Sequence, residues 1–309
     1  MKMKIKQMMT KLTKTTKIIN KSKIKYKKLI RLKKFLSISI STVLIILTLA
    51  FTAHYFYINM MDNSKFSVSF YTVESEKIKK PVRTVHLTDL HTTSYGEKNA
   101  DLINRIISLK PDFLSLTGDM LTYKAGNLEQ TKQVCKELVK IAPVYYSIGN
   151  HEIDEMFYNN SPLVKELSDL GVIVLHDKSI TATYNENKFV IGGLSRSRKQ
   201  IKDYAPYFTE KFLEKKGFHL LLTHFPENFD GYIEDEKYDV ALVGHAHGGH
   251  TRLPLIGALY TKDQGFFPDL TDGMHTFKYG KLIISRGLSN DEIIPRINNI
   301  PELVVVDFE

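Results

Sequence analysis

Five short apolar runs in this sequence end on side chains that can bind a metal ion. The runs cover residues 84–88, 113–117, 144–148, 220–223 and 240–243, and they lead into Asp89 and His91, Asp119, Asn150 and His151, His224, and His245 and His247. Buried parallel strands read as continuous apolar runs, and sites in open α/β sheets lie just beyond the carboxyl ends of the strands. A fold that gathers these five ends would assemble a ligand set for two divalent metals, which is typical of hydrolases.

The five motifs differ in how specific they are. Asp89-x-His91 and Gly118-Asp119 are common by chance, although side chains at i and i+2 of an extended segment point the same way. Gly149-Asn150-His151-Glu152 directly after an apolar strand is a stronger signal. The strongest is residues 244–249, Gly-His-Ala-His-Gly-Gly, where glycines allow close backbone approach beside two imidazoles. Two satisfied core histidines side by side would be the less favoured interpretation.

Alternating strand and helix patterns must position these residues. Helices are predicted over Lys98–Leu109, Leu128–Ile141, Pro162–Leu170 and Pro226–Glu236. Shorter, partly antiparallel strands are predicted over Ile180–Tyr184, Phe189–Ile191, Gly273–Lys278, Lys281–Ser285 and Leu303–Phe308. The alternation predicts an α/β fold, a two-sheet sandwich flanked by helices, with the motifs along one edge.

The amino-terminal part reads differently. Residues 35–61 contain no Asp, Glu, Lys or Arg, which is long enough for a helix across the ~30 Å hydrocarbon core. A buried core helix would show a shorter apolar run, and the long basic region before it disfavours a cleaved signal peptide. We therefore predict an unstructured basic cytoplasmic tail over 1–34, a single transmembrane helix over 35–58, a linker over 59–80 and a folded domain over 81–309.

The charge distribution bears on orientation and partners. Residues 1–34 hold 14 Lys or Arg and no acid, which predicts a cytoplasmic amino terminus and an extracellular catalytic domain in the cell membrane. Removing those 14 from the 43 basic residues leaves 29 against 34 acidic ones, so the remainder carries a net charge of −5. That balance argues against a nucleic-acid partner. The single cysteine, Cys135, excludes an internal disulfide and is predicted to be a packed small side chain.

The order of these motifs resembles the signature of the calcineurin-like metallophosphoesterase superfamily over residues 81–309. The glycine-flanked pair His245 and His247, the later Asp263-Gln264-Gly265-Phe266-Phe267 and the run Ser285-Arg286-Gly287-Leu288 are similar to one membrane-associated branch. That branch is grouped with UDP-2,3-diacylglucosamine pyrophosphatases. The resemblance implies an αββα sandwich and hydrolysis of a phosphoester or pyrophosphate bond.

The resemblance also implies roles for single residues. Asp89, His91 and His247 would bind one metal, Asn150, His224 and His245 the second, and Asp119 both. His151 would not bind metal but would lie over the leaving group. Two ions ~3.5–4 Å apart can clamp a phosphate and generate a hydroxide nucleophile, and His151 could protonate the departing oxygen. Mixed imidazole and carboxylate ligands suit Mn, Fe or Zn.

Three residues depart from the family pattern. His250 stands where this branch usually has Gln, and a structural role is slightly favoured over a substrate contact. Arg196 and Arg198 make basic a loop that is often acidic, so they could recognise an extra phosphate or simply be solvated. This loop leaves the physiological substrate open.

Two alternatives are weighed against a phosphoesterase. A zinc peptidase is disfavoured because Glu155 stands where a His-Glu-x-x-His helix needs its second histidine. A catalytically inert membrane sensor or scaffold on the same fold is disfavoured because every motif position is filled. The predicted partners are therefore a membrane and a phosphoester substrate, lipid-linked or a UDP-sugar. The sequence does not determine the oligomeric state.

Overall fold

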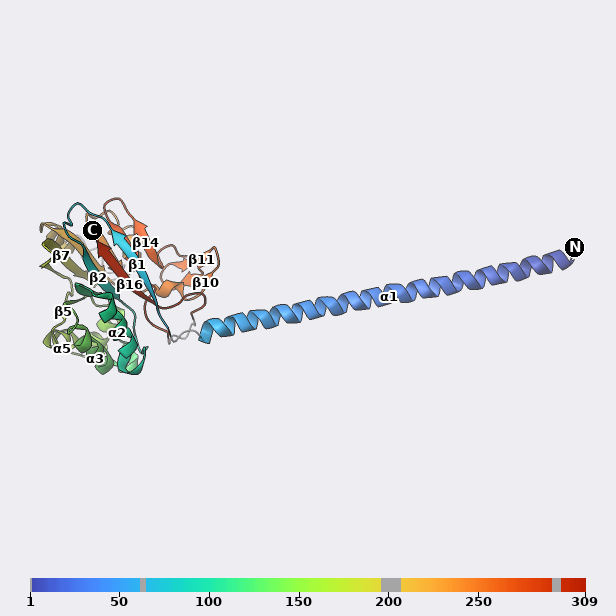
Figure 1. Cartoon of the computed structure of the whole chain (residues 1–309), viewed down its shortest axis with the longest axis horizontal. Coiled ribbons are helices and arrows are strands. Elements are labelled where there is room, and N and C mark those ends of the chain that lie inside the picture. The colour runs from blue at the N-terminus through green and yellow to red at the C-terminus, as the bar shows by residue number, and fades with distance from the viewer. Residues whose placement is uncertain (1, 62–64, 196–206, 291–295) are drawn as a thin grey trace. The chain divides into compact units, whose positions relative to one another are not determined.

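The computed structural model describes residues 2–61, 65–195, 207–290 and 296–309. The chain divides into two units, Met1–Ile58 and Asn59–Glu309 (Figure 1). The described part of the first unit is all helix α1, which begins at Lys2 and ends at Met61, three residues beyond the boundary between the units. Among the described residues, it is the one helix long and apolar enough to cross a membrane, within Ile19–Tyr55, and that window is not buried. A signal sequence passes the same test of length and composition.

The prediction of an unstructured tail over 1–34 is wrong, because α1 already includes these residues from Lys2 onward. The physical reason lies in composition. Residues 1–61 contain neither Gly nor Pro and are rich in Lys, Ile, Leu and Met, so nothing interrupts a helix that begins in the basic region.

The prediction of a linker over 59–80 is also wrong in its second half. Strand β1 (Ser67–Val73) pairs in parallel with the last strand, β16 (Glu302–Phe308), over seven residues. The sequence did not predict this strand because serine and threonine alternate with its apolar residues, and because its outer face is only partly buried. The folded part therefore begins before Pro81.

The second unit is built on two six-stranded sheets. The first has the order β1-β16-β2-β3-β4-β5 and the second β14-β15-β9-β8-β7-β6. In the first sheet β2, β3, β4 and β5 run parallel, while β16 is antiparallel to β2. In the second sheet β15, β9, β8 and β7 run parallel, and β14 and β6 add antiparallel edges. The strands are β2 (Val82–Leu87), β3 (Phe113–Leu116), β4 (Val144–Tyr146), β5 (Ile173–Val174), β6 (Lys178–Tyr184), β7 (Asn187–Leu194), β8 (Phe218–Thr223), β9 (Val240–Val243), β14 (Gly273–Thr276) and β15 (Lys281–Ile284).

Helices cover the outer face of each sheet. Helices α2 (Ala100–Leu109), α3 (Leu128–Leu138) and α5 (Leu163–Asp169) share a core cluster with the first sheet. A helix over 207–213 shares a cluster with the second sheet. The remaining helices are α4 (Asn150–Tyr158), η2 (Glu97–Asn99), η3 (Tyr123–Ala125), η4 (Pro226–Phe229) and η5 (His247–Gly249). Two small hairpins follow η5: β10 (Arg252–Leu253) with β11 (Gly257–Ala258), and β12 (Tyr260–Thr261) with β13 (Gly265–Phe266).

The helix predicted over Pro226–Glu236 is only the four-residue 3-10 turn η4. Gly231 has a φ of 89°, which a right-handed helix cannot accommodate, so the chain leaves the helical path there. The other three predicted helices lie where expected, within two or three residues at their ends.

The strands alternate between the two faces of each sheet. In β16, Leu303 and Val305 pack under the helices, whereas Val304, Val306 and Phe308 pack into the space between the sheets. This period of two is the geometry of a strand with both faces buried. The two-sheet α/β sandwich flanked by helices is therefore confirmed.

Candidate metal centre

The candidate site lies where five parallel strands end. Strands β2, β3 and β4 of the first sheet and β8 and β9 of the second each finish one to four residues before a predicted ligand. Because parallel strands point the same way, their carboxyl ends share one edge of the sandwich. The structure brings all seven predicted ligands and His151 together at that edge. The site residues are thus adjacent in space although they span residues 89–247 in sequence.

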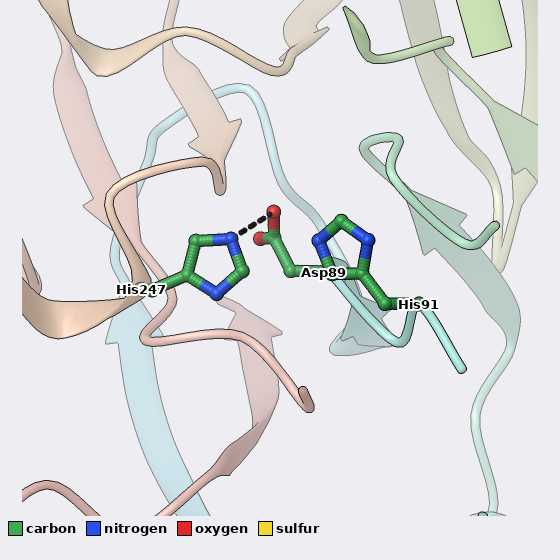
Figure 2. Close-up of side chains that lie close together, drawn as sticks. All are labelled: Asp89, His91 and His247. Atoms are coloured by element: carbon green, nitrogen blue, oxygen red, sulfur yellow. Dashed lines mark ion pairs between the residues drawn. The ribbon is translucent and has the colours of Figure 1, made fainter. Parts of the chain in front are cut away.

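Asp89, His91 and His247 form one group whose ligand atoms lie within 4.8 Å of one another. Figure 2 shows the His247 imidazole turned toward the Asp89 carboxylate, with His91 beside them. Nε2 of His247 lies 3.3 Å from Oδ1 of Asp89. The rings of His91 and His247 are stacked with centroids 5.3 Å apart. All three residues are buried, so they form a compact site for a cation rather than a solvated surface cluster.

Asp119, His224 and His245 form the second group. Nε2 of His224 lies 3.1 Å from Oδ2 of Asp119 and 3.1 Å from Nδ1 of His245. Nε2 of His91, from the first group, lies 4.0 Å from the same Asp119 oxygen. Oδ2 of Asp119 therefore faces an imidazole from each group.

The amide of Asn150 tests whether these residues fit a metal. Its side-chain oxygen faces only hydrogen-bond acceptors. When the oxygen and nitrogen of the amide are exchanged, the nitrogen lies 3.1 Å from Nδ1 of His245 and 3.3 Å from both Oδ2 of Asp119 and Nε2 of His224. Lone pairs of four residues thus converge on one spot. A divalent cation at that spot satisfies all of them at once, so the donor set fits a metal.

The imidazoles of His224, His91 and His245 are each held through the nitrogen that does not face the centre. Nδ1 of His224 lies 2.6 Å from the main-chain oxygen of Thr117, and Nδ1 of His91 lies 3.0 Å from the Thr122 hydroxyl. Nε2 of His245 lies 3.0 Å from a carboxylate oxygen of Asp263. Such outer contacts orient the rings of metal-binding histidines.

The electrostatics of the site favour ionised carboxylates. Burial alone would raise the pKa of Asp119, but the imidazole of His224 outweighs it and holds that pKa well below its usual range. Burial likewise opposes ionisation of Asp89, yet His247 and His224 keep its pKa below the ordinary value. In the metal-free site, burial lowers the pKa of His224, but the charge of Asp119 outweighs burial and raises it to about 10, so a cation that binds here would replace the proton on Nε2. The two aspartates therefore offer a permanent negative charge to a cation.

The backbone is strained at the candidate ligands. Asp89, His91, Asp119, His245 and His247 all have positive φ, between 48° and 68°. Few residues other than glycine adopt this conformation, and it concentrates at functional sites where the surrounding structure enforces it. No sequence pattern predicts this feature, because the tight turns follow from how the strand ends meet.

The glycines of the motifs allow two segments to approach closely. A Cβ at Gly244 would lie 2.1 Å from the Thr88 hydroxyl and 2.4 Å from Oδ2 of Asp89. A Cβ at Gly118 would lie 2.3 Å from the main-chain nitrogen of Gly149. The glycines before Asp119 and His245 are therefore a packing requirement of the converging strand ends.

Glu152 connects the segment that carries Asp119 to the segment that begins with Gly149 and carries Asn150. The sequence motif did not predict this role. Glu152 is fully buried, and its carboxylate accepts hydrogen bonds from the main-chain nitrogens of Asp119, Met120 and Gly149 at 2.8–2.9 Å and from the Tyr146 hydroxyl at 2.6 Å. Burial, followed by the charge of Asp119, raises the pKa of Glu152. Because its oxygens are engaged, Glu152 cannot be the general base of a peptidase.

His151 lies at the start of α4 and faces a cavity of about 520 Å³. Its ring meets that of His91 edge-on, with centroids 4.8 Å apart, and its main-chain nitrogen donates to Oδ1 of Asp119 at 2.8 Å. His250 lines the same cavity and stacks on His247 with centroids 5.4 Å apart. Arg196 and Arg198 lie outside the described residues. The cavity is also lined by Thr92, Thr122, Ala125, Glu227, Thr261, Lys262, Asp263 and Gln264.

Comparison with known proteins adds an independent finding. Residues 82–249 match the profile of the calcineurin-like phosphoesterase family. Phosphodiesterase YaeI of Escherichia coli K12 is 26% identical over 74% of this chain and 82% of its own length. The uncharacterized metallophosphoesterase YkoQ of Bacillus subtilis is 28% identical over 73% and 83%. UDP-2,3-diacylglucosamine pyrophosphatase LpxG of Chlamydia muridarum is 23% identical over 73% and 83%.

Proposed function

This chain belongs to the calcineurin-like phosphoesterase family, and we propose that it is a membrane-anchored member that hydrolyses phosphoester or pyrophosphate bonds of lipid-linked or UDP-sugar substrates. The family uses a dinuclear divalent metal centre, and the chain is a metal-dependent phosphohydrolase. The observation that supports the proposal is the convergence of the seven predicted ligand side chains beside a cavity.

We assign one ion to Asp89, His91 and His247 and the second to Asn150, His224 and His245, with Asp119 shared. The two groups described above support this division, because Oδ2 of Asp119 faces an imidazole of each. The mixture of nitrogen and oxygen donors favours Mn, Fe or Zn.

When bound, two such ions clamp a phosphoryl group and lower the pKa of a water so that it becomes a nucleophile. The residues of the chain do the rest. Glu152 holds the loops of Asp119 and Gly149 in register through its hydrogen bonds. His151 lines the cavity and lies within 4.8 Å of His91 and Asp119; we assign it the role of general acid for the departing oxygen rather than that of a ligand.

The membrane part of the proposal rests on α1. We place its basic end in the cytoplasm and the catalytic unit outside the cell, because 14 basic residues precede the uncharged stretch. Full-length protein should stay with membranes through alkaline carbonate washing. Protease added to intact cells should cut the catalytic unit, and protection there would contradict the orientation.

The substrate class rests on the surroundings of the cavity. Phe157 and Tyr158 at the end of α4 and Phe266 and Phe267 at the β12–β13 hairpin are all exposed. The hairpin also supplies Thr261–Gln264 to the cavity wall, and Tyr158 stacks on Tyr123, whose ring lies 5.8 Å from that of the cavity-lining His151. Large aromatic side chains therefore lie close to the polar site. This combination suits a phosphate that carries an apolar group. The relative LpxG, named for a diacylated UDP-sugar, agrees with that chemistry.

The test is a substrate screen of the Asn59–Glu309 unit loaded with Mn²⁺. Its members are p-nitrophenyl esters, cyclic nucleotides, UDP-sugars with and without acyl chains, and phospholipid head groups. We expect kcat/KM to be higher for UDP-sugars with acyl chains than for those without. The double variant Phe266→Ser with Phe267→Ser should lower kcat/KM for the acylated substrates and leave kcat/KM for p-nitrophenyl esters unchanged. A protein that binds two metals and turns over none of these would instead support an inert sensor or scaffold.

A further inference from the structure

The contact between His245 and the β12–β13 hairpin points to a residue that controls the metal centre from outside it. We propose that Asp263 is a positioning residue, which fixes His245 as a ligand and sets the affinity of the centre for the ion that His245 binds. This inference rests on the ligand set proposed above. It concerns a carboxylate on the cavity rim that the sequence motifs did not mark as part of the centre.

The two nitrogens of His245 have different surroundings. Nδ1 faces the centre, 3.1 Å from Nε2 of His224. Nε2 faces away from it, 3.0 Å from Oδ2 of Asp263. A neutral imidazole carries one N–H, and a carboxylate at Nε2 accepts it and leaves the lone pair of Nδ1 free for a metal. Asp263 therefore selects the tautomer that can bind.

His224 shows how different this anchor is. Its Nδ1 faces the main-chain oxygen of Thr117 at 2.6 Å, and the residue is completely buried. Asp263 instead lies in the turn of a hairpin that lines the cavity, and its side chain is 42% exposed. One imidazole ligand of the second ion is thus held by the core, while the other imidazole ligand is held by a charged group on a surface hairpin.

A second carboxylate lies near the same nitrogen. Oε1 of Glu227 is 3.9 Å from Nε2 of His245, and Glu227 is only 4% exposed. Its other oxygen, Oε2, is buried and has no hydrogen-bond partner among the described residues. Glu227 is close enough to take over part of the anchoring when Asp263 is removed. The effect of Asp263 should therefore be larger in a Glu227→Gln background.

The experiment is a Mn²⁺ titration by calorimetry of full-length, metal-stripped protein in detergent. Wild type should bind two ions, and His245→Ala should lose one of them. Asp263→Ala should keep both but bind one ion about 10- to 100-fold more weakly, as removal of an outer contact does at other metal-bound histidines. Asp263→Asn keeps an acceptor oxygen without the charge and should fall in between.

Asp269→Ala is the matched control, because it removes an exposed carboxylate from the segment that follows the same hairpin. It should bind Mn²⁺ as wild type does, and thermal unfolding of the metal-free variants should coincide. If Asp263→Ala binds both ions as tightly as wild type, alone and with Glu227→Gln, while His245→Ala loses one ion, Asp263 is not a positioning residue and the ligand set stands. If His245→Ala still binds two ions, the ligand set itself is wrong and this inference fails with it.

Discussion

Replacing Glu152 by Gln tests whether one buried carboxylate holds the ligand loops together. Oε2 accepts from two main-chain nitrogens, of Asp119 and Gly149, whereas Oε1 accepts from the Met120 nitrogen and the Tyr146 hydroxyl. A Gln amide should point its nitrogen at Tyr146, because that hydroxyl can reverse and accept. The hydrogen bond from Met120 is then lost, and the remaining ones lose their charge assistance.

The structure sets the magnitude. A hydrogen bond to a charged group is worth roughly 1.5–3 kcal/mol, and a buried donor without a partner costs roughly 1–3 kcal/mol. Glu152→Gln also recovers part of the cost of burying a charge, so we expect a net loss near the lower end, about 2 kcal/mol. Glu152→Ala leaves four donors without a partner and should cost at least about 4 kcal/mol. Tyr146→Phe removes a single donor and should cost about 1.5 kcal/mol.

The assay is urea unfolding of the metal-free Asn59–Glu309 unit, followed by circular dichroism. Metal-free protein separates stability of the loops from binding of ions. The order of loss should be Tyr146→Phe, then Glu152→Gln, then Glu152→Ala. A Glu152→Gln variant within about 0.5 kcal/mol of wild type, which is the size of an ordinary surface substitution, would refute the network.

The other predictions concern the centre, the fold boundary and pH. Asp119→Ala should weaken the binding of both ions and abolish turnover. His151→Ala should keep two metals by elemental analysis but lose roughly 10²–10⁴-fold in kcat, most of all for substrates with poor leaving groups. If His151→Ala instead loses one metal, His151 is a ligand. A unit that begins at Pro81 lacks β1 and exposes the edge of β16, so it should unfold at lower urea than the Asn59 unit; equal midpoints would contradict the role of β1. Burial lowers the pKa of His86 to about 3 in the folded protein, whereas the pKa of an unfolded histidine is ~6.5. As the pH falls below ~6.5, the unfolded chain therefore binds a proton that the folded chain does not, and the free energy of unfolding falls by about 1.4 kcal/mol per pH unit. The stability difference between wild type and His86→Gln, measured by urea unfolding of metal-free protein between pH 6.5 and 5, should shrink accordingly, and a constant difference would contradict it.

The sequence by itself determined the α/β class and the order of the candidate ligands. Both are local properties: an apolar run predicts a buried strand, and the residue after it lies at the strand's end wherever that strand is placed. The uncharged stretch after Phe35 likewise predicts a membrane-length helix from composition alone. The local pattern gave a wrong prediction for β1, because its alternating serines and threonines resemble those of a polar linker.

Only the tertiary structure decided how the ligands are held. His224 is anchored by Thr117, a residue 107 positions away, and His245 by Asp263 on a hairpin of another sheet. The positive φ of Asp89 and the carboxylate bridge of Glu152 likewise arise because strand ends meet. The energy of such a contact depends on the distance between two side chains in the folded state. That distance has no counterpart in the hydrophobic periodicity of either segment. The partners can therefore be identified only from the folded structure.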